Sequence, residues 1–465
     1  MSKNIWLLTE ERPKKAVIQA ILKRFCAEFG VEYVGDIKIL PVISPEGRFQ
    51  FRYKVIGFEA ELVKEIFILP VSGYSSFVDF MLFYQDEQPT DKDKPLLLIE
   101  ETKTDDVESR NTGVYQRCSK FVFTEFFYPN VQKIMLYNRQ IPQKVKPTLT
   151  YIFGTRMLLT LDVEIIGKSL DPEIFRPFSR LDELIDLKNS MPKPYNGVPV
   201  RIKKEQDKIY ISAKLEKAGR LAHDPNIGMV AIMAACIRKL GWSGEIIITK
   251  HGLADQSVVG NKNKFNFIAH EHEIELEGIT LPNVTLPDKY WKVEKEKEKA
   301  GTIFVHVICE NLVDGVSIYE NHGGSERGYF WDHSTIPPMY EAVKKYTNRE
   351  EYKSGNKEAI VYIPDLVLLD VKRNEIINIE GKTYKNRLKG VQELSNYVYF
   401  ELNYIQHYYK DSKLAVGLVL AGSGNAEVAK QIPELILYLD DKGNITLGDR
   451  APQLVKDAVE KLSSL

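Results

Sequence analysis

The sequence predicts an α/β fold with α+β character, because segments with strand and helix patterns alternate along most of its 465 residues. Apolar residues make up 44% of the chain and charged residues 27%, which is typical of a globular protein with a sizeable core. Short apolar runs between polar turns predict strands, and amphipathic segments predict helices. The longest apolar run, residues 227–237, is too short to span a bilayer and is interpreted as a buried helix.

The first segment, residues 1–190, is expected to form one mixed-sheet domain. Residues 13–30 have a helical periodicity that ends at Gly30. Strands of an antiparallel meander are predicted at residues 48–58, 63–70, 75–84 and 95–103. They are followed by a predicted helix within 105–127, a strand at 131–138 and a strand-rich stretch at 148–167.

The remaining chain is expected to form a β-rich middle region, residues 191–330, and a second mixed-sheet domain, residues 331–465. Strands at 244–253 and 301–312 accompany the buried helix of the middle region, and the run EKEKEKAG, residues 294–301, is interpreted as solvated surface. The last segment has predicted helices at 337–352, 384–409 and 451–462, a hairpin at 364–382, and strands at 413–422 and 434–441.

The net charge of −1 indicates that any surface for a polyanion must be a local patch. The cysteines are far apart and form no CxxC pair: Cys26, Cys118, Cys236 and Cys309. That spacing disfavours a zinc ribbon or a disulfide scaffold and suits a reducing compartment. The first residues contain no apolar signal region, so a cytoplasmic protein without a membrane partner is expected.

The predicted hairpin, PDLVLLDVKRNEIINIEGK, carries an unusual concentration of charge. Its turn is centred between Lys372 and Arg373, which puts Asp365 across from Glu380 at roughly 5 Å. Lys382 shares a face with Glu380, because side chains alternate along a strand. Opposed carboxylates suit Mg²⁺, and the main-chain oxygen of Gly381 is available as a further ligand. With a lysine to orient or deprotonate a water, the group suits phosphodiester hydrolysis.

A second hairpin, within residues 75–103, repeats this pattern. Its turn centre places Asp79 opposite Glu100 or Glu101. Glu101 is favoured, because Lys103 then lies on the same face as the glutamate. Asp79, Glu101 and Lys103 are therefore predicted to form a second metal-binding, catalytic group.

Pro364-Asp365 followed by Glu380-Gly381-Lys382 resembles the signature of the PD-(D/E)xK nuclease superfamily. The resemblance implies a metal-binding aspartate on one strand, the glutamate and lysine on the next, and a preceding helix that often adds an acid. Glu341 is the candidate for that acid, and Gln392 for a helper residue on the following helix. It also implies two restriction-endonuclease-like domains that flank the middle region.

The whole chain resembles a type II restriction endonuclease with two active sites in one chain, each of which cuts one strand of double-stranded DNA. Mg²⁺ as the cofactor and a cognate DNA methyltransferase as a functional partner are implied by this resemblance. DNA contacts are expected from basic residues of the polar loops, whose types suit phosphates and base edges. These are Arg220, Lys250, His251, Lys262, Lys264 and Arg327.

Several alternatives stay open at this point. One alternative keeps the fold and changes the role: a repair or defence nuclease that acts on structured or modified DNA, or a nickase that has one inactive centre. A non-enzymatic DNA-binding protein is a further alternative. The C-terminal hairpin is also compatible with an ordinary glutamate–lysine ion pair at the surface, and the N-terminal hairpin with a degenerate or purely structural hairpin.

Overall fold

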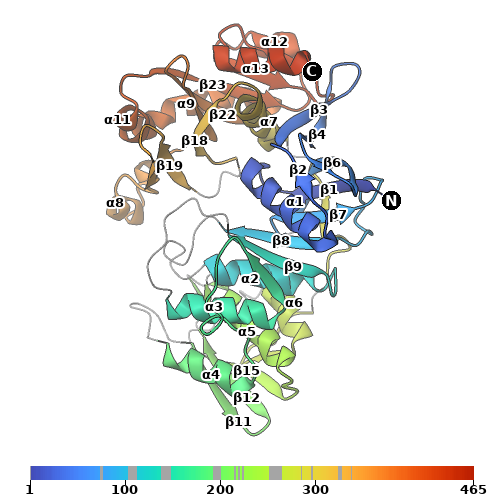
Figure 1. Ribbon diagram of the computed structural model, residues 1–465. Helices are drawn as coiled ribbons and strands as arrows, with labels where there is room; N and C mark the ends of the chain where they lie inside the picture. Colours follow the sequence, from blue (N-terminus) through green and yellow to red (C-terminus); the bar gives the residue numbers. More distant parts are fainter. Residues whose placement is uncertain are drawn as a thin grey trace. The chain divides into compact units, whose positions relative to one another are not determined.

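The computed structural model describes residues 2–73, 77–102, 113–137, 148–191, 200–213, 216–217, 220–221, 225–250, 264–283, 285–294, 297–322, 327–336 and 338–465 (Figure 1). Its contacts divide the chain into two compact units. One consists of Met1–Ser2, Glu11–Pro70 and Glu294–Leu465, and the other of Lys3–Glu10 and Val71–Val293. The units do not follow the three consecutive segments expected, 1–190, 191–330 and 331–465, because early and late residues of the chain share the first unit.

A six-stranded mixed sheet forms the centre of the first unit. Its order is β18 (Val316–Glu320), β21 (Leu366–Asp370), β22 (Glu375–Thr383), β23 (Lys413–Ala421), β24 (Leu435–Leu439) and β25 (Ile445–Leu447). The β18–β21, β21–β22 and β24–β25 pairs are antiparallel, and the β22–β23 and β23–β24 pairs are parallel. Hairpin strands β21 and β22 are buried along most of their length, as their apolar sequences predict.

Helices cover both faces of this sheet (Figure 1). A side chain at Gly301 of α7 (Lys297–Leu312) would meet Val419, whereas one at Gly390 of α9 (Arg387–Leu394) would meet Leu418. Neighbouring residues of a strand point to opposite faces, so α7 and α9 lie on opposite faces of the sheet. The predicted long helix 384–409 is helical with irregular turns, among them a π-helical turn at Glu401–Ile405.

The other elements of the first unit surround this sheet or precede it in the chain. Helix α1 (Lys15–Phe29) ends, as predicted, at Gly30, which has a φ of 62°. The remaining elements are β2 (Tyr33–Val34), β3 (Lys38–Ile43), β4 (Phe49–Ile56), β5 (Glu59–Ala60), β19 (Tyr329–Asp332), β20 (Met339–Ala342), α8 (Arg349–Lys353), α12 (Ala426–Lys430) and α13 (Gln453–Ser463), together with β6 (Val63–Gly73) as far as Pro70.

The second unit contains a sheet with the strand order β10 (Val163–Ile166), β9 (Gln132–Tyr137), β8 (Leu97–Thr102), β7 (Phe80–Tyr84) and β1 (Lys3–Thr9). The β1–β7 and β7–β8 pairs are antiparallel, and the β8–β9 and β9–β10 pairs are parallel. The run β1-β7-β8-β9-β10 therefore has the same order and the same strand directions as β18-β21-β22-β23-β24.

Helices and a smaller mixed sheet complete the second unit. The small sheet has the order β11 (Arg201–Glu205), β12 (Lys208–Ala213), β15 (Glu245–Lys250) and β16 (Ile274–Leu276). The other elements are β13 (Glu216–Lys217), β14 (Arg220–Leu221), β17 (Trp291–Val293), α2 (Gly113–Thr124), α3 (Leu149–Thr160), α4 (Leu181–Ser190), α5 (Pro225–Lys239) and α6 (Lys264–Glu271). The predicted buried helix at 227–237 is confirmed as part of α5, and the middle region is mixed rather than β-rich.

Three predicted elements are wrong. The stretch 148–167 was expected to be strand-rich, but it forms α3, whose first turn is capped by the Thr148 side chain, before the short strand β10. The expected strand 301–312 lies within α7. Both helices are apolar on nearly every side, so periodicity does not separate them from buried strands. The expected helix 337–352 is instead strand β20 followed by the short helix α8.

No helix in the described parts of the chain combines the length and the apolar composition that crossing a membrane requires.

Candidate active site

The C-terminal hairpin has the register that its sequence predicts. Leu366 pairs with Ile379 and Asp370 with Glu375, and the Asp365 amide donates to the Ile379 carbonyl at 3.2 Å. Extending the register by one residue places Asp365 directly opposite Glu380. The predicted opposition of the two carboxylates at the end of the strand pair is therefore confirmed.

The Asp365 side chain is held at the start of β21 by the backbone of the opposite strand. Its Oδ2 accepts a hydrogen bond from the Gly381 amide at 2.9 Å. A Cβ on Gly381 would lie only 3.0 Å from this oxygen and 2.5 Å from the Thr302 methyl group, so glycine permits the close approach. Burial, together with the nearby charge of Glu380, raises the pKa of Asp365 well above its ordinary value.

Glu380 is only 4% exposed, and both of its oxygens are hydrogen-bonded. The Lys382 ammonium donates to one oxygen and the Tyr397 hydroxyl to the other. Burial raises the pKa of Glu380 in spite of these donors. Two carboxyl groups with raised pKa values thus face each other across β21 and β22, where negative charge is incompletely compensated.

Lys382 lies among three carboxylates. Besides Glu380, its ammonium is 3.0 Å from Glu393 Oε2 and 3.5 Å from Glu298 Oε1. Burial alone would lower the pKa of Lys382, but these carboxylates raise it overall. The side chain is therefore a fixed ammonium ion in this arrangement, which suits charge stabilisation and orientation of a water rather than proton abstraction. Gly390 makes room for its stem, since a Cβ there would lie 2.8 Å from Lys382 Cγ.

The additional acid expected from a preceding helix is Glu298, not Glu341. Glu341 lies on β20, where it accepts a hydrogen bond from the Tyr408 hydroxyl at 2.9 Å. Glu298, in the first turn of α7, contacts Lys382 and accepts from the Thr383 amide at 3.3 Å. It belongs to the charged run that was interpreted as solvated surface. Similarly, Gln392 is exposed on α9, and its neighbour Glu393 is the residue that reaches Lys382.

The N-terminal hairpin pairs Phe80 with Ile99 and Leu82 with Leu97, which places Asp79 opposite Glu100. The preference for Glu101 over Glu100 is therefore wrong, because the observed register puts Glu100, and not Glu101, directly across from Asp79. The Glu101 amide donates to Asp79 Oδ2 at 2.7 Å, as the Gly381 amide does to Asp365. Glu101 thus corresponds to Gly381, and Thr102 takes the register position of Lys382.

A lysine from a helix contacts both carboxylates of this second group. The Lys120 ammonium, on α2, lies 3.2 Å from Asp79 Oδ1 and 2.6 Å from Glu100 Oε1. The two carboxylates raise the pKa of Lys120 in spite of its burial. The predicted lysine, Lys103, lies outside the described residues. Sequence reasoning missed Lys120 because its contact with the hairpin depends on how α2 packs and not on local spacing.

The residues expected to contact DNA are only partly described. Arg220 begins β14, Lys250 ends β15 and Lys264 begins α6, whereas His251 and Lys262 lie outside the described residues. The Arg327 guanidinium is half-buried and donates to the Val361 carbonyl at 2.5 Å, and burial lowers its pKa.

Comparisons with known proteins give no relative for this chain. No family model matches the sequence, and neither a curated protein nor a solved structure matches it.

Proposed function

We propose that this protein is a type II restriction endonuclease that hydrolyses phosphodiester bonds of double-stranded DNA with Mg²⁺. The observation that carries the proposal is the opposition of Asp365 and Glu380 at one end of a strand pair, with the Lys382 ammonium beside them. Opposed carboxylates suit a divalent cation that polarises a phosphodiester, and the ammonium suits the negative charge that develops on the phosphate as water attacks.

The donor set fits a divalent cation that prefers oxygen ligands. Burial raises the pKa values of Asp365 and Glu380, and for Asp365 the charge of Glu380 adds to this effect, so a bound cation would favour the ionised form of both groups. These two residues, with the Gly381 carbonyl, would hold Mg²⁺, which supplies polarisation of the phosphate and a more acidic bound water. Lys382 would stabilise the charge that develops on the phosphate. Tyr397 orients Glu380, while Glu298 and Glu393 position the lysine.

The N-terminal hairpin supports the proposal that the chain has two active centres, one for each DNA strand. It has the same strand order and directions, and it holds Asp79 through the same backbone hydrogen bond. Asp79 and Glu100, with Lys120 as the cation, are the proposed second centre. A chain with two unequal centres needs no two-fold axis, which suits an asymmetric recognition sequence. DNA reading by the basic residues of the second unit and pairing with a methyltransferase belong to the same proposal.

A nickase is the second candidate function, and one observation favours it. In the N-terminal hairpin Thr102 occupies the position of Lys382. Among the described residues, the ammonium that reaches Asp79 and Glu100 is that of Lys120, which comes from α2 and bridges both carboxylates. If Lys120 competes with Mg²⁺ for these two groups, the N-terminal centre is inactive and one strand alone is cut.

Digestion of phage and plasmid DNA by the full-length protein tests the proposal. With Mg²⁺ we expect discrete fragments whose sequenced ends share one recognition sequence, and with EDTA we expect intact DNA. Nicks confined to one strand support the nickase, and a smear indicates a non-specific nuclease. Intact DNA under all conditions with a folded protein contradicts the proposal. Glu341→Gln is the matched control, since it changes an acid outside the proposed centre and should cut as the wild type does.

A further inference from the structure

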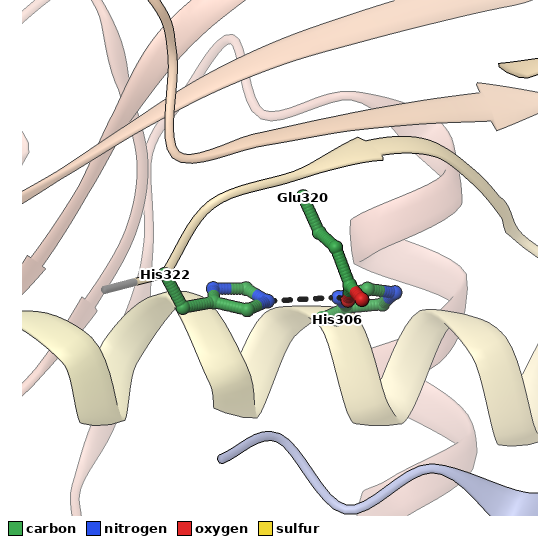
Figure 2. Close-up of side chains that lie close together, drawn as sticks. All are labelled: His306, Glu320 and His322. Atoms are coloured by element: carbon green, nitrogen blue, oxygen red, sulfur yellow. Dashed lines mark hydrogen bonds and ion pairs between the residues drawn. The ribbon is translucent and has the colours of Figure 1, made fainter. Parts of the chain in front are cut away.

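Two histidines and a glutamate converge in the first unit, beside the C-terminal hairpin (Figure 2). His306 comes from α7, Glu320 ends β18, and His322 follows two residues later. His306 Nδ1 lies 2.9 Å from His322 Nε2 and 3.6 Å from a Glu320 oxygen. One potential ligand atom from each residue lies within 4.8 Å of the others.

The orientation of both rings is fixed by the surrounding structure. His322 Nδ1 lies 3.0 Å from Thr302 Oγ1, so its Nε2 points at His306. Two ring nitrogens that face each other at 2.9 Å share a single proton, so at least one of them presents a lone pair. His306 is completely buried, and its other nitrogen, Nε2, has no hydrogen-bond partner among the described residues. The nitrogen of His306 that faces His322 and Glu320 is Nδ1, so Nδ1 is the atom that a cation at this place would meet.

We propose that His306, Glu320 and His322 bind a transition-metal ion, best matched by Zn²⁺, at a site separate from the proposed Mg²⁺ centre. Two imidazole nitrogens and one carboxylate are a ligand set that zinc uses, with a water as the fourth ligand. Two nitrogen ligands of a tetrahedral zinc lie about 3.3 Å apart, close to the separation of the two ring nitrogens. Imidazole ligands also select zinc against magnesium, which prefers oxygen.

The neighbouring charges orient the carboxylate and moderate its affinity for a cation. The Arg12 guanidinium donates to Glu320 Oε2 at 2.7 Å and to Glu310 Oε2 at 2.6 Å, and the Lys14 ammonium lies 4.0 Å from Glu320 Oε1. The charges of Glu310 and Glu320 offset those of Arg12 and Lys14. A bound zinc would therefore share Glu320 with Arg12, since carboxylates that bind a metal commonly also accept a hydrogen bond from a neighbouring side chain.

The position of the site gives the ion a structural role. It would tie α7 to the segment that follows β18, in which the Asn321 amide donates to the Asp365 carbonyl at 2.7 Å. Thr302, which holds His322, also packs its methyl group against Gly381. Zinc at this place would fix the packing of α7 against the hairpin, whatever reaction the hairpin performs.

Metal analysis of the full-length protein tests the inference. The protein is stripped with EDTA, incubated with zinc sulfate, desalted and measured by elemental analysis. We expect the wild type to retain one zinc per chain more than His322→Gln and Glu320→Gln do. Cobalt chloride in place of zinc should give the wild type the visible absorption bands of a tetrahedral site. Thr302→Val should weaken zinc binding by about tenfold, because it removes the hydrogen bond that orients His322.

Matched controls separate this site from adventitious binding and from the proposed catalytic centre. His407→Gln changes an exposed histidine and should keep the full zinc content, as should Asp365→Asn. Circular dichroism checks that each variant is folded. His322 and Glu320 are replaced, and not His306, because they are partly exposed whereas replacement of the buried His306 would destabilise the fold. The inference is overturned if folded His322→Gln and Glu320→Gln retain as much zinc as the wild type. It is also overturned if the wild type retains no zinc.

Discussion

The backbone amide of Gly381 donates to Asp365 Oδ2 at 2.9 Å, which fixes the aspartate against the residue that follows Glu380. The same relationship holds between Glu101 and Asp79, where the distance is 2.7 Å. A backbone amide in each hairpin therefore holds the aspartate and leaves the preceding glutamate opposite it. By this relationship Glu100, and not Glu101, is the counterpart of Glu380.

Substitution of the two adjacent glutamates distinguishes these assignments. Glu100→Gln should abolish cutting of one DNA strand, so that digestion ends at nicked circles, because Glu100 carries the carboxylate opposite Asp79. Glu101→Gln should preserve the backbone hydrogen bond and double-strand cutting. Strand-specific sequencing of the nicks measures both. The reverse pattern, with Glu101→Gln as the nicking variant, would contradict the register argument.

Glu298→Gln should slow DNA cleavage by about tenfold to a hundredfold, because Glu298 positions Lys382 and loss of such an outer partner at a metal site commonly has an effect of this size. Glu298 contacts Lys382 at 3.5 Å and accepts from the Thr383 amide, so the amide variant keeps the shape and removes the charge. Single-turnover rates measure the effect. Glu341→Gln serves as the comparison and should leave the rate unchanged; equal rates for both variants would remove Glu298 from the site.

Gly381→Ala should destabilise the fold by about 1–3 kcal/mol, the usual cost of overpacking. The new methyl group would lie 2.5 Å from Thr302 Cγ2 and 3.0 Å from Asp365 Oδ2. Thr302→Ser removes Cγ2 but keeps the hydroxyl, so the double variant should recover part of the lost free energy of unfolding. Urea denaturation of the four proteins gives the coupling. Strictly additive effects would show that the contact does not limit packing.

Asp365→Asn should stabilise the metal-free protein at alkaline pH. The pKa of Asp365 is raised in the folded state from an ordinary value of 3.8, so the folded protein binds more protons than the unfolded one above that value. The free energy of unfolding therefore falls as the pH rises through the interval between the two pKa values. Asparagine removes this penalty and can still accept from the Gly381 amide.

Thermal unfolding in EDTA measures this effect. At pH 8 the Tm of Asp365→Asn should exceed that of the wild type by a few degrees, and the difference should vanish near pH 3. Mg²⁺ should reverse the order at pH 8, because the wild type gains the free energy of ion binding. A variant that is less stable than the wild type in EDTA at pH 8 would contradict the raised pKa.

The part of the site that depends on local geometry was predictable from the sequence. A tight turn between two apolar strands fixes the register, so the placement of Asp365 across from Glu380 followed from the turn centre alone. In the N-terminal hairpin the turn centre allowed two partners for Asp79. The choice of Glu101 relied on Lys103, whereas the ammonium that contacts Asp79 comes from Lys120.

The parts that depend on packing were not predictable. Residues 301–312 are rich in β-branched and aromatic side chains and are buried on nearly every side, so they resemble a strand although they form α7. Because residues 301–312 are expected to form a strand, the sequence does not predict that the preceding charged run begins a helix. Glu298 reaches the site from the first turn of that helix, so it is not predicted as a site residue. The same expectation separated His306 from His322, whose proximity needs α7 to pack beside the end of β18.

The most direct test compares wild type and Asp365→Asn on DNA that contains the recognition sequence, with Mg²⁺ and in single turnover. If opposed carboxylates at the C-terminal hairpin cut one strand, the variant should produce only nicks, all in the strand that the Asp79 centre cuts, with double-strand breaks reduced at least about a hundredfold. Double-strand breaks by folded Asp365→Asn at the wild-type rate would contradict the account.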